Sequence, residues 1–326
     1  MVLKMNWQDI FGHEAEIAKL KTLVEKEQMP HAVLFIGPEG IGKSLVAKIM
    51  AAALFCADKK NAPCGECFSC RQFFSNQHPD FFSVEPEGTS IKIEQIRQVQ
   101  NEIALSPYLS DKRIVLIDEA NLMTVQSANC LLKTLEEPQG NVVFILISES
   151  RQRLLDTILS RCQVFAFKPL EFGVLAKALR ARSIDADQAN VIARLADGSL
   201  GKALALWEKG GLALRSQAGE VLGVMQMEDI WRISSALGEL ERGRLIEVLD
   251  YLNMLWRDML ILHEDDKSEL IYNIDLRDFL NDKIAAWSTR RLLMAMQVLS
   301  RLRIALRANA NAKLAMEAFL LKLKDL

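Results

Sequence analysis

The stretch that decides the fold is AVLFIGPEGIGKS, residues 32–44. The apolar run Ala32–Ile36 has the length of a buried strand, and a glycine-rich segment follows it directly. The spacing G-x-x-x-x-G-K-S is typical of a loop whose backbone N–H groups bind phosphate oxygens at the start of a helix. The sequence therefore predicts a nucleotide site formed by Gly37, Pro38, Glu39, Gly40, Ile41, Gly42, Lys43 and Ser44.

Four side chains in and beyond this loop have the chemistry for ATP and Mg²⁺. The ammonium of Lys43 would reach the β and γ phosphates, and the hydroxyl of Ser44 would ligate Mg²⁺. Asp118 and Glu119 follow a second apolar run, Arg113–Ile117. Asp118 suits the Mg²⁺ water shell, and Glu119 suits the polarisation of an attacking water. The alternative is that both acids lie in a solvated loop, so these residues predict nucleotide binding and leave hydrolysis open.

Outward from the loop, short apolar runs alternate with helical patterns. The spacing predicts strands at 32–36, 81–84, 113–117, 142–147 and 163–167, and helices at 14–28, 41–55, 94–103 and 126–137. This alternation is typical of βαβ units around a parallel sheet. After Pro169 no strand pattern appears: residues 171–206 predict two or three short helices, and residues 215–326 predict long ones.

Four of the six cysteines lie within FCADKKNAPCGECFSC, residues 55–70. The spacing is C-x7-C-x2-C-x2-C, and the residues are Cys56, Cys64, Cys67 and Cys70. Four thiolates complete a closed tetrahedral Zn²⁺ site, which is structural because no position stays open for substrate. A disulfide pair is disfavoured in a reducing cytoplasm, and an iron–sulfur cluster is the other alternative. Cys130 lies in an apolar helical pattern and is predicted to be a core residue, whereas Cys162 is ambiguous.

The composition is that of a globular protein, because half of the 326 residues are hydrophobic and a quarter are charged. No apolar run approaches the roughly 20 residues of a membrane helix. The N-terminus lacks the apolar core of a secretory signal, so we expect a cytoplasmic protein without a membrane partner. Residues 283–326 carry nine lysines and arginines against two acids. This basic end suits an acidic partner, nucleic acid or a solvated helical face, whereas the net charge of −2 argues against a plain DNA-binding module.

Together these motifs resemble the AAA+ clamp-loader subunits of bacterial DNA polymerase III, and among them the delta-prime branch. The matching segments are HAVLFIGPEGIGKS (31–44), the cysteine insert, HPDFF (78–82), IKIEQIR (91–97), VLIDEANLM (115–123), SANCLLKTLEEP (127–138) and LSRC (159–162). The resemblance implies an α/β P-loop NTPase domain with an AAA+ RecA-like parallel sheet and a zinc-binding insert, followed by a helical lid and an all-α collar. The implied ranges are 1–168 for the nucleotide-binding domain, 56–70 for its zinc module, 169–210 for the lid and 211–326 for the C-terminal oligomerisation domain.

The resemblance also implies a role in DNA replication. Such subunits join delta and the ATP-driven gamma/tau subunits in a five-membered ring, which opens the sliding clamp and loads it onto primed DNA. The ring belongs to the polymerase holoenzyme, a nucleotidyltransferase complex, and this chain is not expected to polymerise DNA itself. Ser160-Arg161-Cys162 matches the family's SRC motif, so Arg161 is implied to act in trans on the phosphoryl group of a neighbour's ATP. Ser148 falls at the family's polar sensor position, where Thr is common.

One departure from the family pattern concerns hydrolysis. Hydrolysing relatives carry a lid sequence like GSLRDA, whose arginine senses the γ-phosphate, whereas this chain has GSLGK at 198–202. Gly201 stands at the arginine's place, so we predict ATP binding with slow or absent independent hydrolysis. The alternatives are a gamma/tau-type motor subunit, disfavoured by Gly201 and the short chain, and an unrelated P-loop remodelling ATPase, disfavoured by the combination of motifs.

Overall fold

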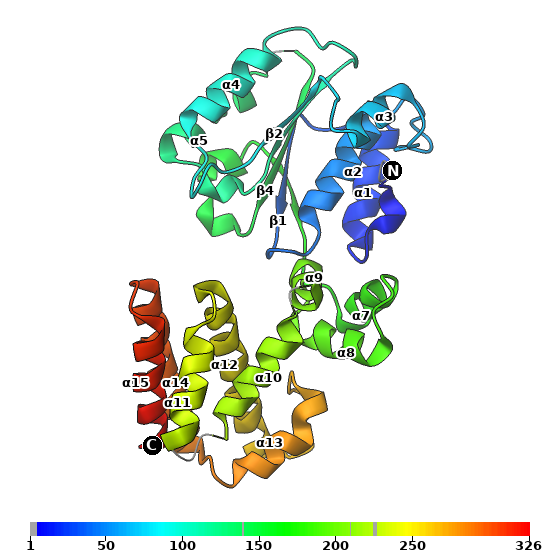
Figure 1. Cartoon of the computed structure of the whole chain (residues 1–326). Coiled ribbons are helices and arrows are strands. Elements are labelled where there is room, and N and C mark those ends of the chain that lie inside the picture. The colour runs from blue at the N-terminus through cyan, green and yellow to red at the C-terminus, as the bar shows by residue number, and fades with distance from the viewer. Residues whose placement is uncertain (1–4, 139, 209, 224–226) are drawn as a thin grey trace. The chain divides into compact units, whose positions relative to one another are not determined.

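The computed structural model describes residues 5–138, 140–208, 210–223 and 227–326. The chain divides into two compact units: Met1–Ala178 with Asp197–Gly201, and Leu179–Ala196 with Lys202–Leu326. Figure 1 shows the helices and strands of both units. The three-part division implied by the family resemblance stays a prediction.

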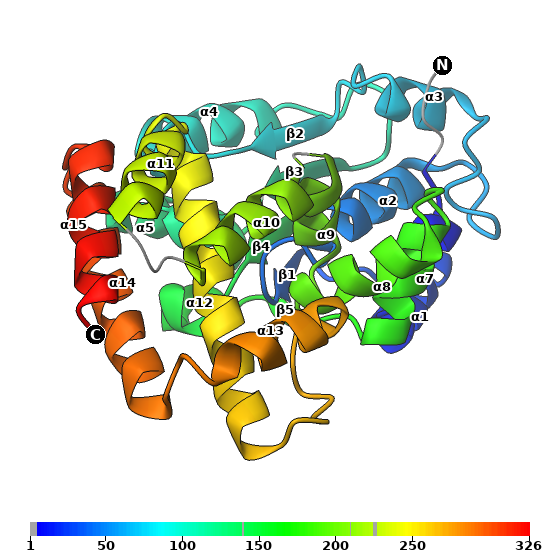
Figure 2. The same ribbon diagram turned by 60° about the horizontal axis from the view of Figure 1, so that its bottom comes forward.

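The first unit is built on a five-stranded parallel sheet with the order β2-β3-β4-β1-β5 (Figure 2). The strands are β1 (Ala32–Ile36), β2 (Phe81–Val84), β3 (Arg113–Ile117), β4 (Val142–Ser148) and β5 (Gln163–Ala166). Because all pairs are parallel, the carboxyl ends of β3, β4 and β1 lie side by side at one edge. The predicted α/β fold with a parallel sheet is confirmed.

Helices cover both faces of this sheet (Figure 1). The helices in this part of the chain are α1 (Glu14–Glu25), α2 (Lys43–Phe55), α3 (Phe68–Phe74), α4 (Ile93–Ile103), α5 (Val125–Glu136), α6 (Asp156–Leu159) and α7 (Phe172–Arg180). Single 3₁₀ turns lie at Trp7–Asp9, Ala120–Leu122 and Arg151–Arg153. One core contains Phe35 and Leu116 with α1 and α2, and the other contains Leu34 and Val115 with α4 and α5. Side chains alternate along a strand, so burial on both faces explains the uninterrupted apolar runs.

Helix α3 was not predicted, because none of the helical patterns in the sequence lies between residues 56 and 80. Cys67 caps this helix, and its Sγ accepts a hydrogen bond from the Cys70 N–H at 3.4 Å. Cysteine is not among the usual N-cap residues, so capping rules give no signal for this helix start. Other differences lie at element ends: α1 ends at Glu25 rather than at residue 28, and β5 ends at Ala166 rather than at residue 167.

The second unit is helical throughout its described residues. Its helices are α8 (Ala186–Leu195), α9 (Leu200–Glu208), α10 (Gly211–Val221), α11 (Met227–Gly238), α12 (Arg242–Glu264), α13 (Arg277–Ile284), α14 (Thr289–Arg307) and α15 (Ala312–Lys324), with a 3₁₀ turn at Ile274–Leu276. With α7, the short helices α8 and α9 confirm the prediction for residues 171–206. The fully buried Trp256 of α12 packs against Trp287 and Phe319, so the long helices share one apolar core.

Candidate functional site

The predicted nucleotide-site residues gather at the carboxyl edge of the sheet. Gly37 follows β1, Asp118 follows β3 and Ser148 ends β4, and these strands are neighbours in the sheet. The Gly37 N–H donates to the Ser148 carbonyl at 3.2 Å. Ligands of open α/β sheets bind outside the carboxyl ends of the strands, so the position is that of a ligand site.

The phosphate loop (Gly37–Ser44) turns sharply between β1 and α2. Gly40 and Gly42 have φ values of +74° and +102°, in the left-handed region that favours glycine. Between them, Ile41 is 2% exposed and packs into the core beneath the loop. His13 Nε2 lies 3.1 Å from the Ile41 carbonyl oxygen. The loop is thus fixed to the domain by an apolar anchor between two glycine turns.

Lys43 lies inside this loop, with 6% of its surface exposed. Its Nζ donates to the carbonyl oxygens of Gly37 and Pro38 at 2.6 Å each. Burial lowers the pKa of the Lys43 ammonium, and nearby carboxylates, Asp118 foremost, oppose that change. The ammonium is therefore held by backbone carbonyls inside the loop that the sequence predicts to bind phosphate.

Ser44 and the two acids after β3 form the part of the site that suits a cation. The Ser44 Oγ donates to Asp118 Oδ2 at 2.8 Å. Glu119 is exposed, has φ +50°, and donates its backbone N–H to Asp118 Oδ1 at 2.9 Å. Partial burial, followed by the charge of neighbouring acids, raises the pKa of the Glu119 carboxyl. Since a carboxylate with a raised pKa is a better proton acceptor, Glu119 has the chemistry of a general base.

Ser148 is 1% exposed and contacts Asn121, to which the sequence patterns gave no role. Its hydroxyl proton has two acceptors within reach, the Ser150 carbonyl at 3.0 Å and Asn121 Oδ1 at 3.3 Å. The same Asn121 oxygen accepts the Glu149 N–H at 3.3 Å. Asn121 therefore connects the carboxyl ends of β3 and β4, and its place directly after Asp-Glu-Ala was the available signal.

An unpredicted contact to the phosphate loop comes from Ser199 and Gly201, at the start of α9. The Ser199 Oγ donates to the Glu39 carbonyl at 2.9 Å, and the Gly201 N–H donates to the Gly40 carbonyl at 2.7 Å. Ser199 is 3% exposed. The hydroxyl and its acceptor are 160 residues apart, so no local pattern could reveal the contact.

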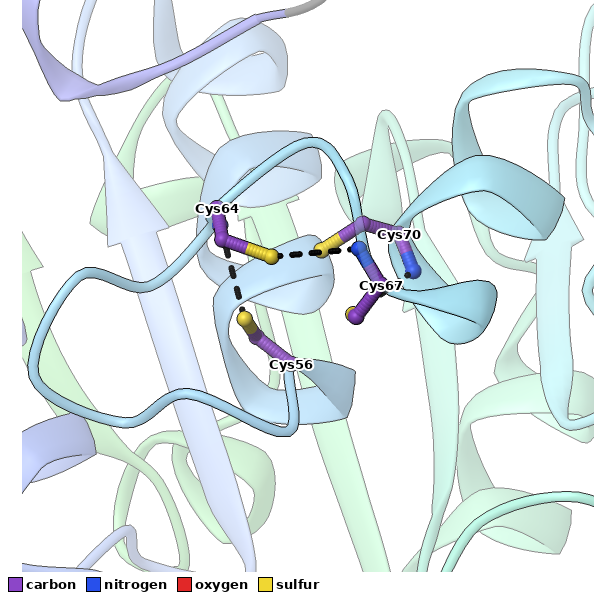
Figure 3. Close-up of side chains that lie close together, drawn as sticks. All are labelled: Cys56, Cys64, Cys67 and Cys70. Atoms are coloured by element: carbon purple, nitrogen blue, oxygen red, sulfur yellow. Dashed lines mark hydrogen bonds between the residues drawn. The ribbon is translucent and has the colours of Figure 1, made fainter.

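The predicted metal ligands form one cluster at α2 and α3 (Figure 3). The Sγ atoms of Cys56, Cys64, Cys67 and Cys70 all lie within 4.8 Å of one another. Cys56 directly follows α2, Cys67 and Cys70 lie at the start of α3, and Cys64 lies between the helices. Tetrahedral Zn–S bonds of about 2.3 Å place sulfurs about 3.8 Å apart, so the four thiols fit a zinc ion after a small contraction.

Backbone N–H groups prepare part of this cluster for ionisation. The Cys64 Sγ accepts from the N–H groups of Cys67 at 3.3 Å and Glu66 at 3.5 Å. Burial raises the pKa of Cys64, but these hydrogen bonds outweigh it and lower the pKa to about 7. Burial raises the pKa of Cys56 and of Cys70, so these two thiols require a cation to ionise at neutral pH. The set is suited to a structural metal.

Arg161 lies at the other edge of the sheet from the phosphate loop. It comes just before β5, whose Gln163 pairs with Val33 near the start of β1, whereas the phosphate loop follows the end of β1. A five-residue strand separates the two edges by roughly 16 Å at about 3.3 Å per residue. Arg161 and the phosphate loop are therefore on opposite edges of one sheet.

Three neighbours hold the Arg161 guanidinium. One terminal nitrogen donates to the Thr157 carbonyl at 2.9 Å and to Ser160 Oγ at 3.3 Å. The other terminal nitrogen forms an ion pair with Glu136 at the end of α5. The arginine side chain remains 31% exposed. The group is oriented by its neighbours and accessible from outside.

The comparisons with known proteins agree with these features. A family model described as "DNA polymerase III, delta subunit" matches residues 12–171. DNA polymerase III subunit delta' of Bacillus subtilis is 31% identical, with 99% of this chain and 100% of that protein covered. The chain belongs to the delta-prime family of DNA polymerase III subunits. The delta' subunit of Pseudomonas aeruginosa is 32% identical, with 91% of this chain and 92% of that protein covered.

The delta-prime family is related to the longer subunits of the same polymerase. DNA polymerase III subunit tau of Bacillus subtilis is 30% identical over 76% of this chain, which spans 44% of that protein. The chain is thus a member of the AAA+ clamp-loader family, with the phosphate loop and helix-covered parallel sheet of that class. Among the described residues of this delta-prime family member, none of the helices has the length and apolarity needed to cross a membrane.

The two remaining cysteines of the chain, Cys130 and Cys162, lie outside the metal cluster. Cys162 is 9% exposed, packs with the core between the sheet and α5, and has its pKa raised by burial to about 11. Cys130 is half-buried, and its Sγ lies 3.2 Å from Gln100 Oε1. The ambiguous Cys162 is therefore a core residue, and Cys130 is partly solvated rather than fully inside the core.

Proposed function

We propose that this chain is the delta-prime subunit of a cytoplasmic clamp loader. It joins gamma/tau and delta subunits, helps to load the sliding clamp onto primed DNA, and supplies Arg161 to a neighbour's ATP site. The position of Arg161 carries this proposal, because the residue lies just before β5, about one five-residue strand (roughly 16 Å) from the edge of the sheet where its own phosphate loop would bind a nucleotide. A permanently charged guanidinium with several donors stabilises charge on a transferring phosphoryl group, so we assign Arg161 to act in trans.

The phosphate loop would bind ATP together with Mg²⁺. Lys43 has the reach and charge for the β and γ phosphates, and the hydrogen-bonded pair of Ser44 and Asp118 fits the coordination sphere of one Mg²⁺ ion. Bound Mg²⁺ would supply charge neutralisation for the phosphates. Glu119 would polarise water, and Ser148 would contact the γ-phosphate side of the site. Because Gly201 provides no side chain for sensing the γ-phosphate, hydrolysis by this chain alone should be slow or absent.

The remaining parts have structural roles in this proposal. Zn²⁺ held by the four clustered cysteines would join the ends of α2 and α3 and fix the segment 56–70 between them. Residues 169–210 would act as the lid of the nucleotide site, and residues 211–326 would form the collar that joins the other subunits. Contact with DNA would come through the assembled ring.

The test is reconstitution with gamma/tau and delta subunits, followed by measurement of DNA-dependent ATP turnover and clamp loading. Arg161→Ala should assemble normally and lower turnover at the neighbouring site by about a thousandfold, as expected for an arginine acting in trans. Arg97→Ala, which removes an exposed arginine of α4, is the matched control and should leave turnover unchanged. Full turnover with Arg161→Ala would refute the proposed role.

An assay of ATP hydrolysis by the isolated chain distinguishes a gamma/tau-type motor subunit from the proposed function. We expect no steady-state ATP hydrolysis above background. Sustained hydrolysis that disappears with Lys43→Ala would show that the chain is a motor subunit in its own right.

A further inference from the structure

Residues Gly198–Gly201, which we call the brace, pack directly against the phosphate loop. The Ser199 hydroxyl, nearly inaccessible at 3% exposure, donates to the carbonyl of Glu39 at 2.9 Å. The backbone N–H of Gly201 donates to the carbonyl of Gly40 at 2.7 Å. Two consecutive loop carbonyls therefore accept hydrogen bonds from the brace.

The approach of the brace depends on glycine at two positions. A Cβ on Gly201 would lie 2.9 Å from the Gly40 Cα and 3.2 Å from the Gly40 carbonyl oxygen. A Cβ on Gly40 would lie 2.4 Å from the Ser199 Oγ. The first of these contacts is with backbone atoms, which cannot rotate away as a flexible side chain can. A side chain at residue 201 would therefore push the brace off the loop.

The brace is also anchored on its other side. The Gly198 carbonyl accepts the N–H of Leu170 at 2.9 Å, and Leu170 is 8% exposed. Gly198 has φ +78°, and a Cβ there would lie 2.5 Å from the Pro169 Cβ. The brace is thus held between the phosphate loop and the segment that follows β5.

Peptide geometry makes the carbonyl contacts control the direction of the loop N–H groups. In a planar trans peptide, the C=O of one residue and the N–H of the next point in opposite directions. Since the carbonyls of Glu39 and Gly40 point to the brace, the N–H groups of Gly40 and Ile41 point away from it. Backbone N–H groups of such loops are the donors that bind phosphate oxygens.

We propose that Ser199 and Gly201 are positioning residues of the phosphate loop. They hold two carbonyls on the brace and so fix the direction of the loop N–H groups before a triphosphate arrives. The inference rests on the ATP binding assigned under the proposed function. A loop that is already ordered loses less conformational freedom on binding, so the brace increases the affinity for ATP.

The test measures the full-length chain in two ways: hydrogen exchange of backbone amides without nucleotide, and titration with a fluorescent ATP analogue in the presence of Mg²⁺. Gly201→Ala should abolish protection of the residue 201 amide and speed exchange in the phosphate loop. It should also weaken ATP binding about tenfold, the size of one hydrogen bond of ordinary strength. Ser199→Ala should weaken it by about threefold, because the backbone contact of Gly201 remains.

Two matched controls separate positioning from general destabilisation. Gly243→Ala adds a Cβ in α12 that meets nothing within 4 Å. Ser216→Ala removes an exposed hydroxyl of α10. Both should leave loop exchange and ATP affinity unchanged. Unchanged loop exchange in Gly201→Ala, or an equal increase in the amides of β3 and β4, would overturn the positioning role. Failure of the wild-type chain to bind ATP would instead refute the proposed nucleotide binding, because loop exchange tests the brace without nucleotide.

Discussion

The phosphate loop and the Arg161 corner, residues 157–161, lie at opposite edges of one sheet and hold their positive charges differently. In the loop, Lys43 is 6% exposed and donates to carbonyls of the loop itself. At the corner, the side chains of Arg161 and its partner Glu136 are 31% and 48% exposed. The first charge is enclosed by its own backbone, whereas the second is presented at the surface. The proposed function uses this difference, because it assigns nucleotide binding to the first edge and a role in trans to the guanidinium at the second.

The two regions also differ in where their support comes from. The brace residue Ser199 lies 160 residues from its acceptor in the phosphate loop. The ion-pair partner of Arg161 lies 25 residues away, and the other two contacts are closer in sequence. The phosphate loop is therefore complete only when the brace, at the start of α9, has packed on it, whereas the corner needs only segments that are nearer in the sequence. Changes in the brace should affect the loop and leave the corner unchanged.

The largest expected effect on stability comes from the metal cluster. It would contradict the comparison if the phosphate loop depended on the bound metal. Helix α2 begins at Lys43 and ends just before Cys56, so the helix connects the two sites. We predict that Cys64→Ser releases the metal and lowers the free energy of unfolding by about 3 kcal/mol, because a lost structural metal is among the large single-site effects. Affinity for ATP should stay near the wild-type value. Metal content, urea denaturation and ATP titration measure the three quantities.

Cys130→Ser is the control for this change, because Cys130 is a half-buried cysteine outside the cluster. It should keep the full metal content and stability. A wild-type chain purified under reducing conditions without metal would contradict the zinc assignment. Loss of ATP binding together with the metal would show that the phosphate loop is not independent of the cysteine module.

A smaller effect, confined to one edge of the sheet, is expected from Lys43→Ala. Removal of two charge-assisted contacts to phosphates should weaken ATP binding by about a hundredfold. Assembly with the other subunits should proceed, and the turnover that we propose to depend on Arg161 should persist, because the corner is untouched. Calorimetric titration and turnover of the reconstituted complex measure the two effects. Lys48→Ala, a half-buried lysine on the same helix, should leave the affinity unchanged.

Together, Lys43→Ala and Arg161→Ala test whether the two edges of the sheet have separate roles. The first should lose nucleotide binding by this chain and keep the neighbour's turnover, and the second should do the reverse. If both variants lost the same activity to the same degree, the two edges would not have separate roles.

The parts of the site that sequence could predict are contained in short stretches. The phosphate loop, the acids Asp118 and Glu119, and the four-cysteine spacing each depend on residues within a single segment, where residue type and spacing state the chemistry. The strands were predictable for a related reason, since burial on both faces makes each one an apolar run. The structure brings the predicted loop, acids and Ser148 to one edge of the sheet, and it groups the cysteines.

The parts that sequence could not predict depend on contacts between distant segments. At Gly201 the pattern indicated only a missing arginine, whereas the structure shows its N–H on the Gly40 carbonyl and no space for a Cβ. Asn121 had no recognisable role until its side chain was seen to connect the ends of β3 and β4. The ion pair between Arg161 and Glu136 joins two matched motifs, but neither motif indicates the contact by itself.

The smallest expected effect is at that ion pair, and it tests whether the corner depends on the carboxylate. Glu136→Gln removes a partly exposed partner, and such pairs contribute less than about 1 kcal/mol to stability. The guanidinium keeps its bonds to Thr157 and Ser160, so turnover of the reconstituted complex should stay within about twofold of wild type. Thermal denaturation and steady-state turnover measure both values.

Glu137→Gln, at the next exposed position, is the matched control and should behave as wild type. A loss of turnover with Glu136→Gln as large as that with Arg161→Ala would mean that the carboxylate is required to orient the guanidinium. Arg161 and Glu136 would then form a fixed pair, and the guanidinium would depend on its local partner as Lys43 depends on the loop carbonyls. Retained turnover would instead mean that Arg161 can leave Glu136 at little cost in free energy when a neighbour's phosphates compete for the guanidinium. This property distinguishes the corner from the enclosed Lys43.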